Sequence, residues 1–191
     1  MTLHRLRPIS RKHSEDDRLL SSRPVSIDTC TLINLLASGV GEVPLHNLSA
    51  ERLISEAVSR ESLFLRSPTA GQPPERIDLN PLIQSGSLTV CRAETEEEEE
   101  LYVQLAAELD DGEALSIAIS ISRGHALATD DRKAIRIAKQ LGVVELITTP
   151  DIVASCSGIE LIEVLQTIEF RARFSPSSDH PLRAWWTAHK K

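Results

Sequence analysis

Four carboxylates stand at points where the sequence changes from a short apolar segment or a loop to a helical repeat. Asp28, Asp130 and Asp131 follow apolar segments, and Glu113 opens the repeat DGEALSIAISIS. In a parallel sheet with right-handed crossovers such junctions lie along one edge, so we expect these side chains to gather. Neighbouring carboxylates repel one another unless a proton or a cation neutralises them. Oxygen ligands without His or Cys favour Mg²⁺ or Mn²⁺ over zinc.

A cation held by a few carboxylates keeps positions for water and for phosphate oxygens, which predicts metal-assisted phosphodiester hydrolysis. Three cations follow the last acid pair at i, i+4 and i+7 of the predicted helix: Arg132, Arg136 and Lys139. They are candidates for binding a polyanionic substrate, and the alternative is an ordinary solvated helix face. No Ser/His/Asp set or Gly-rich phosphate loop competes with this interpretation.

Each acid also has a purely structural interpretation. Asp28, Asp130 or Asp131 could each cap the helix that follows it, and Asp110 with Glu113 has the spacing of a capping box. Any one of them alone is better explained as a cap. Their recurrence at three separate junctions favours the cation site.

The chain has 191 residues, enough for one α/β domain, and its low aromatic content predicts a core of Leu, Ile, Val and Ala. The predicted strands span residues 25–27, 87–91, 126–128 and 143–147. Helices are predicted at residues 49–61, 77–85 and 159–170, and directly after Asp28, Thr95, Asp111 and Asp131. Residues 67–76, rich in Pro and Gly, predict a loop.

The charge is unevenly distributed. Residues 1–24 are basic and predict a flexible extension, residues 176–191 form a basic tail, and the body between them is acidic. An acidic body repels nucleic acid, so such a substrate needs metal ions, a local basic stripe or the basic ends. Thr95 with Glu98 predicts a capped helix start for the Glu run. The tail carries Trp185 and Trp186, which we expect to dock on the domain or on a partner.

Three cysteines, Cys30, Cys91 and Cys156, are too widely spaced for a zinc site and odd in number for a disulfide framework. They predict reduced thiols and a cytoplasmic protein. The sequence also lacks an apolar run of the roughly 20 residues that cross a bilayer, so we expect no membrane partner.

At the acidic junctions the chain resembles the PIN domain. The segments VSIDTCTLINLL and DDGEALSIAISISRGHALATDDRKAIRIAKQLG are similar to its toxin-like branch, which has an Asp-Thr-Ser/Cys start, a Gly-Glu-Ala third motif and an Asp-Asp fourth motif. The resemblance covers residues 25–175. It implies a Rossmann-like, three-layer α/β/α sandwich with a central, mainly parallel sheet. It further implies that the acids bind Mg²⁺ or Mn²⁺ and hydrolyse RNA.

Residue by residue, the resemblance makes Asp28 the first acid, Glu113 the third-motif acid and Asp130 the fourth, accompanied by Asp131. For the second-motif acid, the spacing from Val58 favours Glu61, with Glu56 as the alternative. Residues 40–54 are longer and more polar than a compact toxin would have. An antitoxin protein and a homodimer are further implications of the resemblance.

The main hypothesis is an Mg²⁺/Mn²⁺-dependent endoribonuclease, the toxin of a toxin–antitoxin pair. Its catalytic residues are Asp28, Glu113, Asp130 and Asp131, and its metal ligands are Asp28, Glu113, Asp130 and Glu61. The alternative is a non-catalytic PIN-like interaction module. A phosphatase with Asp28 as nucleophile is a weaker third hypothesis, because Cys30 stands where a second Asp is expected.

Overall fold

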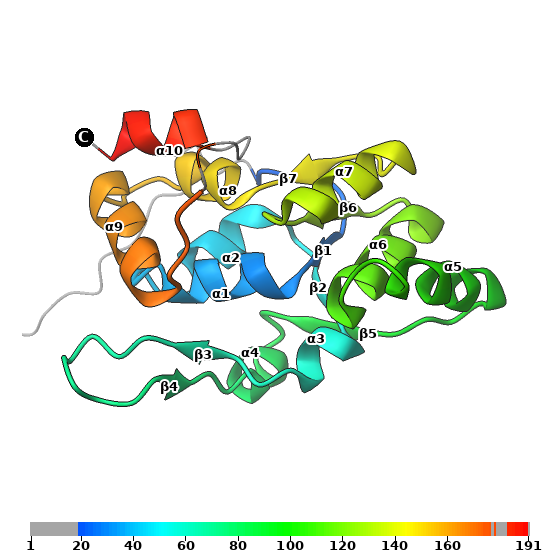
Figure 1. The fold of residues 1–191 in the computed structure, drawn as a ribbon, viewed down its shortest axis with the longest axis horizontal. Coiled ribbons are helices and arrows are strands. Elements are labelled where there is room, and N and C mark those ends of the chain that lie inside the picture. Colours follow the sequence, from blue (N-terminus) through cyan, green and yellow to red (C-terminus); the bar gives the residue numbers. More distant parts are fainter. Residues whose placement is uncertain (1–18, 177, 179–182, 191) are drawn as a thin grey trace, which may run out of the picture.

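A computed structural model describes residues 19–176, 178 and 183–190, and within them five short parallel strands form the central sheet (Figure 1). The order in space is β5-β2-β1-β6-β7. The strands are β1 (Val25–Ile27), β2 (Arg52–Ser55), β5 (Thr89–Cys91), β6 (Ala126–Ala128) and β7 (Leu146–Ile147). The chain order reverses between β1 and β6, which are neighbours in the sheet. Such a switch point is where ligands bind in open α/β sheets.

Helices cover both faces of the sheet, which confirms the three-layer α/β/α sandwich. One layer contains α1 (Thr29–Ala37), α2 (Val43–Leu48), α4 (Asn80–Gln84) and α8 (Thr149–Ser155). The opposite layer contains α5 (Glu96–Ala106), α6 (Asp111–Arg123) and α7 (Arg132–Gln140). Leu, Ile, Val and Ala fill both cores, as the composition predicts.

The start of α5 confirms the local interpretation of the Glu run. The Thr95 hydroxyl accepts from the Glu98 N–H at 3.2 Å and so caps the helix. Glu98 is buried and forms two hydrogen bonds of 2.7 Å with Arg123, at the end of α6. This ion pair ties α5 to α6, so Glu98 serves the fold.

The predicted helix over residues 49–61 is wrong. The structure has strand β2 at Arg52–Ser55 and then the short helix α3 (Glu56–Arg60). Leu53 and Ile54 pair on one side with β1 and on the other with β5. Pairing on both edges, with helices packed on both faces, outweighs the helical spacing of the apolar residues in this segment.

Other elements differ in detail from the sequence prediction. The 67–76 segment closes a two-stranded hairpin, β3 (Phe64–Leu65) with β4 (Glu75–Arg76), so its last residues are a strand. Residues 149–155 form α8, a helix that the sequence did not predict, and its start is a capping box between Thr148 and Asp151. The helix predicted at 159–170 is α9 (Leu161–Arg171).

Most of the predicted N-terminal extension, residues 1–18, lies outside the described residues. Residues 20 and 21 run beside the end of α2, where their N–H groups donate to Asn47 and Leu48 carbonyls at 2.9 Å. The tail contains α10 (Arg183–His189), and Trp186 packs edge-on against Phe174 with ring centroids 5.2 Å apart. Trp186 therefore docks on the domain. No helix in the described part of the chain combines the length and apolarity of a membrane span.

Ile54→Ala is expected to lower the free energy of unfolding by about 2 to 5 kcal/mol, because Ile54 is 0% exposed in the middle of the sheet. Urea denaturation measures the change. Val103→Ala is the matched control: Val103 is 66% exposed on α5, so its loss is expected to stay within about 0.5 kcal/mol. Equal losses in the two variants would contradict the position of β2.

Candidate active site

Asp28 and Asp130 follow two adjacent strands at the switch point of the sheet. Asp28 comes directly after β1, and its N–H donates to the Ala128 carbonyl at the end of β6 at 3.0 Å. Asp130 follows β6 after one intervening residue. The two side chains are 1% and 2% exposed, respectively. The strand register thus places two buried acids together, as the sequence predicts.

The Asp28 carboxylate is held by three donors. It accepts from the Thr31 N–H at 2.8 Å, from the Thr129 hydroxyl at 2.5 Å and from the Cys30 thiol at 3.1 Å. Burial nevertheless raises the pKa of Asp28 to about 6, and the charge of Asp130 adds to the increase. Asp28 is therefore both the cap of α1 and a carboxylate that would gain from a cation.

Asp130 is held by Asn34 of α1 and by Thr149 at the start of α8. The Asn34 side-chain amide donates to Oδ2 and the Thr149 N–H donates to Oδ1, each at 2.8 Å. The Thr149 hydroxyl also donates to Oδ2. Asn34 and Thr149 are functional candidates that the sequence analysis missed. The only local signal was the polar Asn34 between the apolar residues Ile33 and Leu35.

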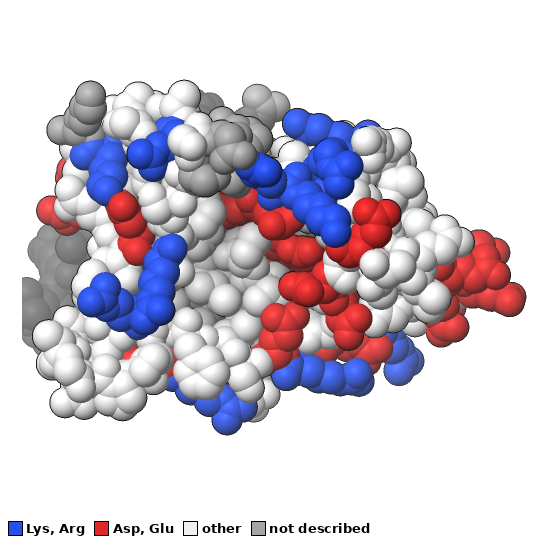
Figure 2. All heavy atoms as spheres, viewed as in Figure 1, with Lys and Arg blue, Asp and Glu red and all other residues white. Residues whose placement is uncertain are grey.

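Glu113 reaches the site from the first turn of α6, in the opposite layer. Burial raises the pKa of Glu113 to about 7, and the nearby charges of Asp131 and Asp28 add to the increase. The structure therefore brings this acid within electrostatic reach of the strand-end acids, as predicted. In Figure 2 acidic side chains gather between the N-termini of α1 and α6 and the short helix α3.

Glu61, directly after α3, points at Gly112 in α6. A Cβ added to Gly112 would lie 2.6 Å from Glu61 Oε1 and 3.1 Å from Val58 Cγ2. Only glycine allows this close approach without displacement of a neighbour. Burial raises the pKa of Glu61, and the charges of Asp110 and Asp111 add to the increase. The second-motif acid favoured by spacing thus lies beside the Gly-Glu-Ala segment.

The two remaining candidate acids make local contacts. Glu56 forms an exposed ion pair with Arg60 at 2.7 Å on α3. Asp131 caps α7: its Oδ1 accepts from the N–H groups of Lys133 at 2.7 Å and Ala134 at 2.8 Å. The Asp131 carboxylate thus caps the start of α7, and its negative charge raises the pKa of Glu113.

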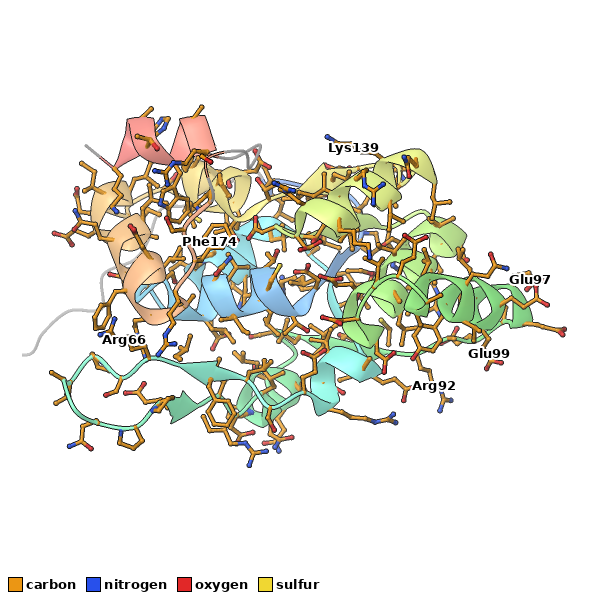
Figure 3. All side chains as sticks on the ribbon, in the orientation of Figure 1. Arg66, Arg92, Glu97, Glu99, Lys139 and Phe174 are labelled. Carbon is orange, nitrogen blue, oxygen red and sulfur yellow. The ribbon has the colours of Figure 1, made fainter. Side chains whose placement is uncertain are left out.

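The predicted substrate-binding residues of α7 are all exposed: Arg132, Arg136 and Lys139. Figure 2 shows Lys and Arg side chains of this helix bordering the acidic cluster. Lys139 lies at the outer edge of α7 in Figure 3, whereas Arg132 directly follows the acid pair in the sequence. The beginning of α7 is therefore the part of this stripe next to the site.

The donor set suits a hard divalent cation, because it consists of carboxylate oxygens. Burial raises the pKa values of Asp28 and Glu113, and neighbouring negative charges add to the increase. Among the described residues, however, no three His, Cys, Asp or Glu side chains are close enough to form a ready-made metal site. The gathering of acids is looser than the sequence analysis expected. Asp28 and Asp130 are fixed by hydrogen bonds, so Glu113 and Glu61 are the side chains that would adjust.

Comparison with known families agrees with this geometry. A family model, DUF3368, described as a PIN domain, matches residues 24–168, most of the chain. No curated protein and no solved structure matches the chain.

The metal-free protein is expected to lose stability as the pH rises from about 4 to about 7. The folded Asp28 and Glu113 keep their protons up to pH values of about 6 and 7, whereas the unfolded groups lose theirs near 3.8 and 4.5. The folded state therefore binds more protons in this window, and raising the pH favours unfolding. The loss for Asp28 alone is roughly 2 to 3 kcal/mol.

Urea denaturation in EDTA at several pH values measures this effect, with Glu113→Gln as the comparison. The variant has no carboxylate to ionise at this position, so its stability is expected to fall less steeply between pH 5 and pH 7.5. Parallel pH profiles for the two proteins would contradict the raised pKa of Glu113.

Proposed function

The chain belongs to the PIN domain family, and from that premise we propose that it is an Mg²⁺- or Mn²⁺-dependent endoribonuclease. PIN domains are generally nucleases and typically use divalent metal ions. The observation that carries the proposal is the pair of buried carboxylates, Asp28 and Asp130, at the switch point of the sheet, with Glu113 near enough for the charge of Asp28 to raise its pKa. Burying such like charges together is costly unless a cation compensates.

In this proposal Asp28, Asp130, Glu113 and Glu61 hold the cation. When bound, the metal would acidify an attacking water and neutralise charge on the scissile phosphate. Asn34, Thr149 and Thr129 hold the two strand-end carboxylates in place through the hydrogen bonds described above.

The substrate that we propose is RNA, bound next to the acids by Arg132 and Arg136 and more distantly by Lys139. These cations lie on the exposed face of α7, beside an otherwise acidic surface. They would attract phosphates locally where the body of the protein repels them. Asp131 supports this role by capping the helix that carries them.

We further propose that the protein is the toxin of a cytoplasmic toxin–antitoxin pair, with an antitoxin protein as partner and a homodimer as the assembly. The resemblance of its Asp-Thr-Cys, Gly-Glu-Ala and Asp-Asp segments to the toxin-like branch supports this. One observation favours the alternative of a non-catalytic interaction module. Both oxygens of Asp130 are already engaged by Asn34 and Thr149, and the described residues hold no ready-made metal site.

Cleavage of a mixed pool of single-stranded and structured RNA tests the function. Wild-type protein is expected to cut with Mn²⁺ or Mg²⁺ and not with EDTA. Glu113→Gln is expected to cleave RNA much more slowly than wild type. Removing a group that only hydrogen-bonds to a metal ligand costs roughly 10- to 100-fold in activity, and the loss of a ligand itself is expected to cost more. This variant is preferable to Asp130→Asn. The NH₂ group of that asparagine would replace an acceptor oxygen and face the N–H donors of Asn34 or Thr149, which could disturb the fold. Metal-dependent cutting by Glu113→Gln at the wild-type rate would contradict the assignment.

Glu61→Gln and Glu56→Gln form a matched pair for the second-motif acid. Glu61 lies against Gly112, whereas Glu56 is paired with Arg60 on the surface. We expect Glu61→Gln to weaken Mn²⁺ binding by about tenfold or more, and Glu56→Gln to bind like wild type. Titration calorimetry with Mn²⁺ measures both affinities. The reverse order of effects would assign the role to Glu56.

A further inference from the structure

A second charged surface lies away from the acids, where the β3–β4 hairpin meets the end of α9. A pocket of about 250 Å³ opens there, lined by Phe64, Leu65, Arg66, Pro74, Arg171, Ala172 and Arg173. Its lining contains three arginines and no acidic residue, in a chain whose net charge is −7. Figure 2 shows a group of Lys and Arg side chains on the same face of the molecule as the acidic cluster.

The arginines of this pocket have different roles. Arg171 is structural: its guanidinium donates to Glu75 of β4 and to the Arg66 carbonyl, and its own carbonyl accepts from the Arg66 N–H at 2.8 Å. These bonds tie the hairpin to α9. Arg66 and Arg173 are exposed, and Arg173 has a φ of +56°, a left-handed conformation that a non-glycine residue rarely adopts.

Aromatic rings lie beside these charges. Phe64 is 51% exposed and Phe170 is 42% exposed, although both are large apolar side chains. The Arg66 guanidinium stacks over the Phe170 ring, 4.3 Å from its centroid, as the positions of Arg66 and α9 in Figure 3 illustrate. An exposed ring beside an oriented guanidinium offers a flat stacking surface together with positive charge. A base and its phosphate need that combination.

The size and place of the pocket limit its occupant. It is smaller than the roughly 300 to 1,000 Å³ of a typical small-molecule pocket, so it suits one nucleotide. Helix α1, which Asp28 caps at its start, packs against both α9 and β3. The nine residues of α1 span about 13 Å. The acids lie at the start of this helix, so a short stretch of a nucleic-acid strand would reach from them to the pocket (Figure 1).

We propose that this pocket binds one nucleotide of a single-stranded RNA whose scissile phosphate lies at the Asp28–Asp130 site. Phe64 stacks on the base, and Arg66 and Arg173 contact the backbone phosphate. The proposal rests on the proposed ribonuclease function and adds a contact at a distance from the cleaved bond. A duplex does not present an unpaired base, so the pocket selects single strands.

Fluorescence anisotropy with a labelled short single-stranded RNA tests the proposal, with the full chain in EDTA so that binding is measured without cutting. Phe64→Ala is expected to weaken RNA binding by about 5- to 100-fold. Phe64→Tyr keeps an aromatic ring and is expected to bind RNA with wild-type affinity. Arg173→Ala is expected to reduce the slope of log affinity against log salt by about 0.7. Arg92→Ala, an exposed arginine near β5 at the other end of the molecule, is the matched control (Figure 3).

An RNA with abasic sites separates stacking from charge: Phe64→Ala is expected to bind it like wild type, and Arg173→Ala more weakly than wild type. Wild-type affinity for ordinary RNA in both Phe64→Ala and Arg173→Ala would overturn the pocket, even if the protein cleaves RNA. Pocket-dependent binding without metal-dependent cleavage would instead remove the ribonuclease and leave an RNA-binding module. The two proposals therefore fail separately.

Discussion

The burial of two carboxylates at the ends of adjacent parallel strands is the constraint on which this site depends. Asp28 and Asp130 are almost completely shielded from water, and each charge would be costly there without compensation. Hydrogen-bond donors supply part of this compensation. They come from α1, from the turn after β6 and from the start of α8. These segments meet only because β1, β6 and β7 are neighbours in the sheet.

The remaining compensation has to come from outside the protein. Glu113 approaches from α6, where its charge and those of Asp28 and Asp131 repel one another. Glu61, at the end of α3, is repelled by Asp110 and Asp111 at the start of the same helix α6. Gly112 permits this approach because a larger residue would displace the Glu61 carboxylate. Either protons or a divalent cation can relieve the repulsion. Stability is therefore coupled to pH at this location, and the proposed cation would stabilise the folded protein at the same place.

The arrangement of charge on the surface is compatible with the polyanionic substrate that we propose for this acidic protein. The acids are concentrated at the switch point, and basic residues lie on α7 on one side and at the hairpin–α9 pocket on the other (Figure 2). Attraction is therefore local and short-ranged, because salt screens it beyond about 10 Å. A strand that contacts both basic surfaces would pass the acids. A molecule that touches only the acidic body would be repelled.

The sequence by itself determined the features that depend on near neighbours along the chain. Asp28, Glu113 and Asp130 were identifiable because each begins or precedes a helix after an apolar segment or loop, and the caps at Thr95 and Asp131 follow from spacings of two or three residues. The family resemblance rests on the same local motifs, and the match over residues 24–168 confirms it.

Only the tertiary structure decided the features that depend on distant neighbours. Residues 52–55 form a strand because β1 and β5 pair with them on both edges, which their own helical spacing does not reveal. Asn34 and Thr149 join the site through contacts with Asp130 across 96 and 19 residues. The spacing from Val58 already favoured Glu61 over Glu56, but only the structure shows that Glu61 approaches Gly112. Order in the sheet, and not local preference, brings these groups together.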